Sequence, residues 1–221
     1  MVAIFVILTI IFFLGLDMLV RHRSEKKIVP EVLPLAHLSR LLPRGVFVQP
    51  NFTWSRILDD GNIALGIHPL LLGLTGKPDE ITTLSTGEEA RKGKSLLSIR
   101  KGERHLHLNA PTDGIIRRVN PDMKSIEQET DFESNWLFVI EPAHLSEELP
   151  GWMIAEKAEA WLGRKYQQIR DFLVGSGLNP EAGATLADGG DIPVGVLSEL
   201  DEGIWHRFEV DFCNSDSEIS N

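Results

Sequence analysis

The chain has 221 residues, with 32 acidic against 22 basic side chains and a formal net charge of −10. Residues 1–27 hold four basic and two acidic residues, so the remainder carries 18 − 30 = −12. A protein this acidic is a poor partner for nucleic acid, because nucleic-acid binding depends on neutralising phosphates. The single cysteine, Cys213, excludes an intramolecular disulfide and suits a reducing compartment.

The first segment of the chain is a long apolar run. Residues 2–20 are apolar except for Thr9 and Asp17, and at about 1.5 Å per residue they just span a hydrocarbon core of about 30 Å. Four basic residues follow the run and none precede it: Arg21, Arg23, Lys26 and Lys27. A cleaved signal peptide has the opposite arrangement. We therefore predict a single-pass transmembrane anchor over residues 1–21 rather than a buried helix, with the rest of the chain cytoplasmic.

Residues 22–45 are predicted to form a juxtamembrane linker that contains one short helix. Prolines punctuate this segment, and Leu35, Leu38, Leu41 and Leu42 mark an amphipathic face between them. The helix could lie on the membrane surface or pack on the domain that follows. Packing on the domain is the preferred alternative.

A β-hairpin is the clearest feature of the middle of the chain. The apolar residues Leu96, Leu97 and Ile99 end at a charged turn, Arg100-Lys101-Gly102-Glu103, where the glycine allows positive φ. Beyond the turn, polar and apolar residues alternate over 105–108, which places Leu106 and Leu108 on one face and the two histidines on the other. A second turn over 110–114 leads into another strand over 115–119. The pattern predicts a hairpin displayed on a small β module.

The hairpin and its flanks resemble the lipoyl/biotinyl carrier domains, most closely the H protein of the glycine cleavage system. The matching residues of the hairpin region are Gly87, Lys92, Gly93, Pro111, Gly114, Val119 and Asn120, and those of its flanks are Trp54, Asp60, Gly61, Gly66, Ile67, Gly76, Asn135, Trp136, Leu137, Ile140 and Pro142. The resemblance covers roughly residues 50–150. It implies a mainly β, α+β fold: a barrel-sandwich hybrid over 46–150, here preceded by one transmembrane helix and followed by a C-terminal amphipathic helix.

The sequence departs from the carrier pattern at the hairpin tip. In the family, lipoate is attached to a lysine eight positions before the exit proline, and counting back from Pro111 reaches Glu103 (111 − 8 = 103). A carboxylate cannot form the lipoyl amide, which needs a nucleophilic amine. The nearest lysine is Lys101, two residues earlier and about 6–7 Å away along an extended chain. We therefore expect no cofactor, with covalent lipoate on Lys101 as the alternative.

The C-terminal part, residues 151–212, is predicted to hold a helix and an extension. Apolar residues recur at helical spacing over Ile154–Leu173: Ala158, Trp161, Leu162, Ile169, Phe172 and Leu173. Further along, Trp205, Phe208, Val210 and Phe212 are typical of an edge strand or a docking segment. The last residues, 213–221, are polar and acidic and are predicted to be disordered.

Two groups of residues have types that can carry chemistry. Glu103, His105 and His107 could share a strand face and bind a transition metal, although a solvated face explains the same alternation. His206, Asp211 and Cys213 combine a nucleophile with possible bases, but a cysteine so near the end of the chain has no obvious oxyanion site. We expect neither a metal site nor catalysis.

These observations leave two functional hypotheses. The first is a non-catalytic, membrane-anchored module whose hairpin tip binds an unidentified cytoplasmic or membrane protein through Lys101, Gly102, Glu103 and Arg104. The second is a lipoyl carrier of the glycine cleavage system that uses Lys101 to shuttle an aminomethyl group. A third, an adaptor of inner-membrane exporters, is disfavoured because only a few residues separate the two halves of the β module and the charges favour the cytoplasmic side.

Overall fold

The structure is a computed structural model, and it describes residues 33–123, 132–176, 186 and 188–214. The apolar run 2–20, for which an anchor is predicted, lies outside these residues. Among the residues that the structure describes, no helix is long and apolar enough to cross a membrane. A compact unit begins at Pro34.

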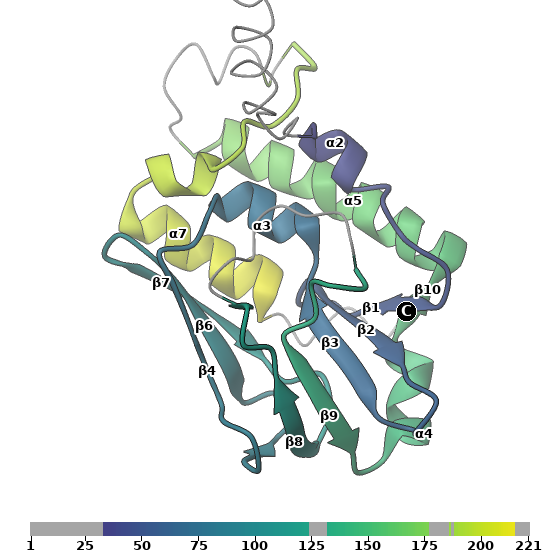
Figure 1. The fold of residues 1–221 in the computed structure, drawn as a ribbon. Helices are drawn as coiled ribbons and strands as arrows, with labels where there is room; N and C mark the ends of the chain where they lie inside the picture. Colours follow the sequence, from purple (N-terminus) through teal and green to yellow (C-terminus); the bar gives the residue numbers. More distant parts are fainter. Residues whose placement is uncertain (1–32, 124–131, 177–185, 187, 215–221) are drawn as a thin grey trace, which may run out of the picture. The chain divides into compact units, whose positions relative to one another are not determined.

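The larger of two antiparallel sheets has seven strands (Figure 1). In spatial order they are β10 (Met153–Ile154), β1 (Val46–Val48), β2 (Thr53–Ile57), β3 (Ile63–Ile67), β9 (Phe138–Pro142), β8 (Gly114–Val119) and β5 (Glu89–Ala90). Strand β10 pairs with β1 through Phe47–Ile154 and Val48–Met153. The sheet therefore includes residues after position 150, where the β domain was expected to end.

The smaller sheet contains the predicted hairpin. Its strands are β4 (Glu80–Thr83), β6 (Ser95–Lys101) and β7 (Arg104–Asn109), in the order β4-β6-β7. Leu106 and Leu108 are fully buried while His105 and His107 are exposed, which confirms the predicted alternation along β7. With two antiparallel sheets and several helices, the structure confirms the predicted α+β class.

Part of the core forms around Trp54 on β2. Its ring packs against Phe132 with centroids 5.2 Å apart, and its indole N–H donates to the carbonyl of Ile67 at 3.1 Å. On the neighbouring strand, a Cβ at Gly66 would stand 2.6 Å from the Trp54 ring. The glycine is therefore needed because the indole occupies the space of a side chain. Helix α3 (Pro69–Thr75) follows β3 and is buried along its whole length.

Two helices predicted from leucine and aromatic spacing are confirmed. The first, α2 (Leu35–Leu38), is shorter than predicted, because Leu41 and Leu42 lie beyond its end. It buries Leu35 and Leu38 and packs on α3, which is the preferred alternative of packing on the domain. The second, α5 (Ala155–Val174), places Trp161 against Phe52 on the β domain, with ring centroids 5.2 Å apart. Phe172, predicted to belong to the apolar stripe, is only partly buried.

The C-terminal extension docks as helices, so the edge-strand alternative is wrong. The chain forms α7 (Glu202–Phe208) and the π-helical turn η4 (Glu209–Cys213), after the short elements α4 (Leu145–Glu148), η2 (Leu149–Gly151) and η3 (Val196–Glu199). Trp205, Phe208 and Phe212 are buried, whereas Val210 is half exposed. Burial thus follows helical spacing rather than alternation. Cys213, predicted to lie in the acidic tail, is buried, and residues 215–221 lie outside the described part.

Candidate functional site: the hairpin apex and the pocket at its base

The hairpin ends in a two-residue turn, Gly102-Glu103. Lys101 and Arg104 form the last strand pair, and Gly102 has φ +59°. A positive φ at the first turn residue is the requirement of a type II′ turn, whose twist matches that of the flanking strands. The turn therefore presents Glu103, which is exposed and has no hydrogen bond or ion pair to any described residue.

The lysine beside the turn is held against the loop that precedes β4. The Lys101 ammonium donates to the carbonyl of Lys77 at 2.7 Å and lies 3.5 Å from a carboxylate oxygen of Asp79. The other Asp79 oxygen accepts from the backbone N–H of Gly102 at 2.7 Å. This N–H, helped by the charge of Lys101, holds the pKa of Asp79 below its usual value. Asp79 thus fixes both the backbone of the turn and the side chain of Lys101.

The other side of the apex is attached to the C-terminal extension. The Arg104 guanidinium donates to the carbonyl of Ser198 at 2.5 Å and to that of Leu197 at 3.4 Å. It also lies over the Trp205 ring, 5.8 Å from its centroid. Of the predicted tip residues, Lys101, Gly102 and Arg104 are therefore anchored to the protein, and Glu103 faces solvent.

Side chains of the C-terminal extension complete the outer edge of β7. Trp205 donates its indole N–H to the carbonyl of His105 at 2.7 Å, and Glu209 accepts the backbone N–H of His107 at 2.8 Å. These two backbone groups would otherwise point away from the sheet unpaired. Sequence reasoning missed this contact, and the only signal available was the aromatic spacing that predicted a docking segment.

The histidines of β7 lie side by side without forming a metal site. The rings of His105 and His107 stack with centroids 6.3 Å apart and an interplanar angle of 13°. No group of three or more His, Cys, Asp or Glu side chains in the described residues is arranged to hold a metal ion. The three residues Glu103, His105 and His107 therefore do not form a ligand set.

The second predicted group of reactive residue types is also dispersed. Cys213 is buried in η4, and this burial strongly raises the pKa of its thiol. His206 is exposed on α7, where its Nδ1 lies 3.6 Å from the Glu209 carboxylate. A thiol in this setting is not activated as a nucleophile.

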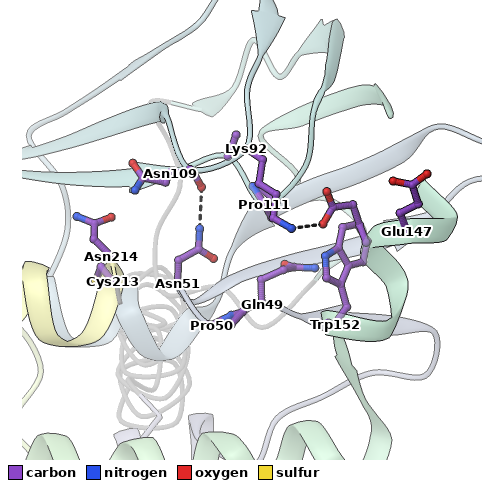
Figure 2. Close-up of a pocket in the computed structure, with 14 residues that line it drawn as sticks. Gln49, Pro50, Asn51, Lys92, Asn109, Pro111, Glu147, Trp152, Cys213 and Asn214 are labelled. Atoms are coloured by element: carbon purple, nitrogen blue, oxygen red, sulfur yellow. Dashed lines mark hydrogen bonds and ion pairs between the residues drawn. The ribbon is translucent and has the colours of Figure 1, made fainter. Parts of the chain in front are cut away.

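A pocket of about 550 Å³ lies at the base of the hairpin (Figure 2). Asn51 reaches across it and donates from its side-chain amide to the carbonyl of Asn109 at 2.7 Å. On another wall, Lys92 and Glu148 form an ion pair at 2.5 Å beside Trp152. These amides and paired charges can bind a polar group. They do not place a nucleophile beside a base, and no local sequence pattern predicts that these residues converge.

About half of this chain is similar in sequence to known proteins. No protein-family model matches the chain. The chain is 28% identical over 121 residues to a probable glycine cleavage system H protein of Thermococcus gammatolerans, covering 53% of this chain and 90% of the relative. With the same coverage, it is 27% identical over 121 residues to that of Thermococcus kodakarensis and 25% over 120 residues to that of Pyrococcus abyssi.

Among solved structures, a glycine cleavage system H protein from Mycobacterium marinum matches with a TM-score of 0.45 and 20% identity. The match covers 56% of this chain and 98% of that chain. The sequence comparisons agree with the resemblance found in the motifs. Over about half of its length, the chain is similar to glycine cleavage system H proteins.

Proposed function

We propose that this chain is a membrane-anchored, non-catalytic module, similar to the H protein, that carries no lipoate and binds a partner protein through its hairpin apex. The observation that carries the proposal is the composition and attachment of that apex. An exposed glutamate occupies the turn, and Lys101, the lysine that precedes the turn, is already bound by Asp79 and the Lys77 carbonyl.

The residues present do not fit a lipoyl group. Attachment needs a free lysine amine at the tip, because the amide forms by attack of that amine on an activated acyl group. Glu103 supplies a carboxylate at the position that the carrier pattern reserves for lysine. Lys101 lies at the end of β6, and its ammonium is turned back onto the protein surface. Modification there would have to break both contacts and would place the arm beside the turn rather than on it.

The same contacts favour a recognition surface. Asp79 fixes one side of the turn, and the carbonyls of Leu197 and Ser198 fix the other through Arg104. A preorganised loop loses less conformational entropy on binding than a free one. The exposed Glu103, with His105 and His107 beside it, offers a mainly polar surface for a partner protein. An anchor at residues 2–20 would raise the effective concentration of this surface near membrane partners.

Intact-mass measurement after expression in a lipoylating host tests the absence of lipoate. We expect no lipoyl increment on the wild type or on Lys101→Arg, and a lipoyl increment on Glu103→Lys, which restores an amine at the tip. The Glu103→Lys variant shows that the host can modify this hairpin. A lipoyl increment on the wild type that disappears in Lys101→Arg would overturn the proposal.

Partner recovery from a detergent extract tests the recognition surface. We expect a protein retained by the wild type to be lost with Glu103→Ala and kept with Glu159→Ala, which removes an exposed glutamate of α5. Equal recovery with all three proteins would place the recognition surface elsewhere.

A second candidate is a lipoyl carrier that uses Lys101 and shuttles an aminomethyl group. The similarity to relatives named probable H proteins favours it. The Lys101 side chain also keeps 29% of its surface exposed, so its contacts could be exchanged for a modification. The mass measurement separates this candidate from the first.

A further inference from the structure

A second pocket, of about 240 Å³, lies between α2 with the residues that follow it, α5, and residues 189–191. It shares no residue with the hairpin or with the pocket at the hairpin base. Figure 1 shows α2 alongside α5 in this part of the molecule. Its walls join segments far apart in the sequence, since the backbone N–H of Ala36 donates to Asp191 at 3.0 Å.

Two arginines line this pocket with their charges unpaired. Arg40 is exposed just beyond α2, and Arg170 is half-buried on α5. Within the described part of the chain, neither guanidinium has a hydrogen bond or an ion pair. By contrast, Arg56, Arg91 and Arg117 each pair with a glutamate. Although the protein has ten more acidic than basic residues, no acidic side chain of the described residues pairs with either guanidinium in this pocket.

The one carboxylate in the pocket is already occupied. A single oxygen of Asp191 accepts the N–H of Ala36, the N–H of Ile192 at 2.9 Å and the Tyr166 hydroxyl. Burial, followed by this bond to Asp191, raises the pKa of Tyr166 to about 12, so the hydroxyl stays protonated as a donor. Asp191 therefore links α2 to α5 through these hydrogen bonds. With one carboxylate against two guanidiniums, the pocket keeps a net positive charge.

Gly189 lies beside Arg170 in a backbone conformation that favours glycine. Gly189 has φ +91°, and a Cβ at this position would stand 4.0 Å from Nη2 of Arg170. Gly189 and the Arg170 guanidinium therefore line the pocket as neighbours. The exposed carboxamide of Gln167, one turn of α5 before Arg170, lines the same space and can donate to a ligand.

We propose that this pocket binds a phosphate group through Arg40 and Arg170. A guanidinium presents a planar set of donors that binds two oxygens at once, and two guanidiniums on different elements suit the tetrahedral oxygens of phosphate. The volume holds one such group with part of its substituent. The phosphate can come from free phosphate or from a phospholipid headgroup. This site does not depend on the hairpin function proposed above.

Calorimetric titration of the full chain in a neutral detergent tests the site. One arm uses inorganic phosphate at constant ionic strength, and a second uses dihexanoyl phosphatidylglycerol, with phosphate-free dihexanoylglycerol as its control. Binding in the first arm alone identifies free phosphate as the ligand. Binding in the second alone identifies the lipid headgroup, and binding in both identifies a site for either source.

In each arm that binds, removing the guanidiniums must weaken the affinity. We expect Arg40→Gln to weaken it by about tenfold, and the double variant with Arg170→Gln by more, because each change removes charge-assisted hydrogen bonds. Arg164→Gln, an exposed arginine of the same helix α5, should bind as the wild type does. Arg40 is itself exposed, so its variant is expected to fold even if the double variant does not. Failure of the wild type to bind either probe, or wild-type affinity in Arg40→Gln, would overturn the proposal.

Discussion

Gly114 stands where strands β8 and β9 come too close for a side chain. A Cβ there would lie 2.3 Å from the carbonyl oxygen of Glu141 and 2.8 Å from Cγ2 of Ile140. We expect Gly114→Ala to lower the free energy of unfolding by about 1–3 kcal/mol, because backbone atoms must move. Urea denaturation measures the change.

The control is a glycine with free space around it. A Cβ on Gly163 of α5 meets nothing within 4 Å, so Gly163→Ala should raise the free energy of unfolding by up to about 1 kcal/mol through helix propensity. Equal losses in both variants would show that the close approach at Gly114 is not the cause.

The lowered pKa of His68 makes the free energy of unfolding depend on pH. Burial lowers the pKa of this side chain from 6.5 to about 4. Its Nδ1 accepts the N–H of Leu70 at 3.2 Å, so the proton of the neutral ring lies on Nε2, 3.3 Å from the carbonyl of Leu41. Between these two pKa values the unfolded chain binds more protons than the folded one, so stability falls as pH drops from 6.5 towards 4.

From this single group we expect a loss of about 2 kcal/mol between pH 7 and pH 5. Unfolding measured at both pH values should show this loss in the wild type. In His68→Asn, which keeps an acceptor for Leu70 but does not titrate, the loss should be smaller by about that amount. An unchanged pH dependence in the variant would contradict the assignment to His68.

Strand β7 and the C-terminal extension form one unit at the level of elements. Glu209 is buried, and it accepts the backbone N–H of His107 from outside the sheet. We expect Glu209→Ala to speed amide hydrogen exchange at His107 by about tenfold or more, since an unpaired buried donor costs about 1–3 kcal/mol. Exchange followed by NMR or mass spectrometry measures this opening.

Glu209→Gln serves as the matched control because its carbonyl oxygen can still accept from His107. Exchange in this variant should stay near that of the wild type. If both variants exchange at the same rate, the extension does not protect the edge of β7.

The elements differ in how far local sequence decides them. The hairpin is predictable because a glycine turn and alternating leucines act within a few residues of each other. Helix α5 is predictable from its apolar spacing. The aromatic residues over 205–212 fit both alternation and helical spacing, and Asp201, whose side chain accepts from the N–H of Ile204 at 2.8 Å, caps the helix that forms. Packing against β7 selects between the two.

At the scale of the whole molecule, the membrane anchor remains a prediction from residues 2–20. We expect the full chain to stay with the membrane fraction during alkaline carbonate extraction, and a variant lacking residues 2–20 to move to the supernatant. The hydrophobic length of the run is the physical reason. Release of the full chain by carbonate would contradict a spanning anchor.

The sequence alone determined the α+β class, the hairpin and the long helix, and it predicts Glu103 at the position where the resemblance to carrier domains implies a lysine. Each of these depends on residue types or on spacing within one segment. The tertiary structure decided where Lys101 and Arg104 are anchored, which residues cover the edge of β7, and that Arg40 and Arg170 line one pocket. These contacts join residues separated by 20 to more than 100 positions, and no local pattern encodes them. They depend on how the elements pack, and only the folded chain brings these residues together.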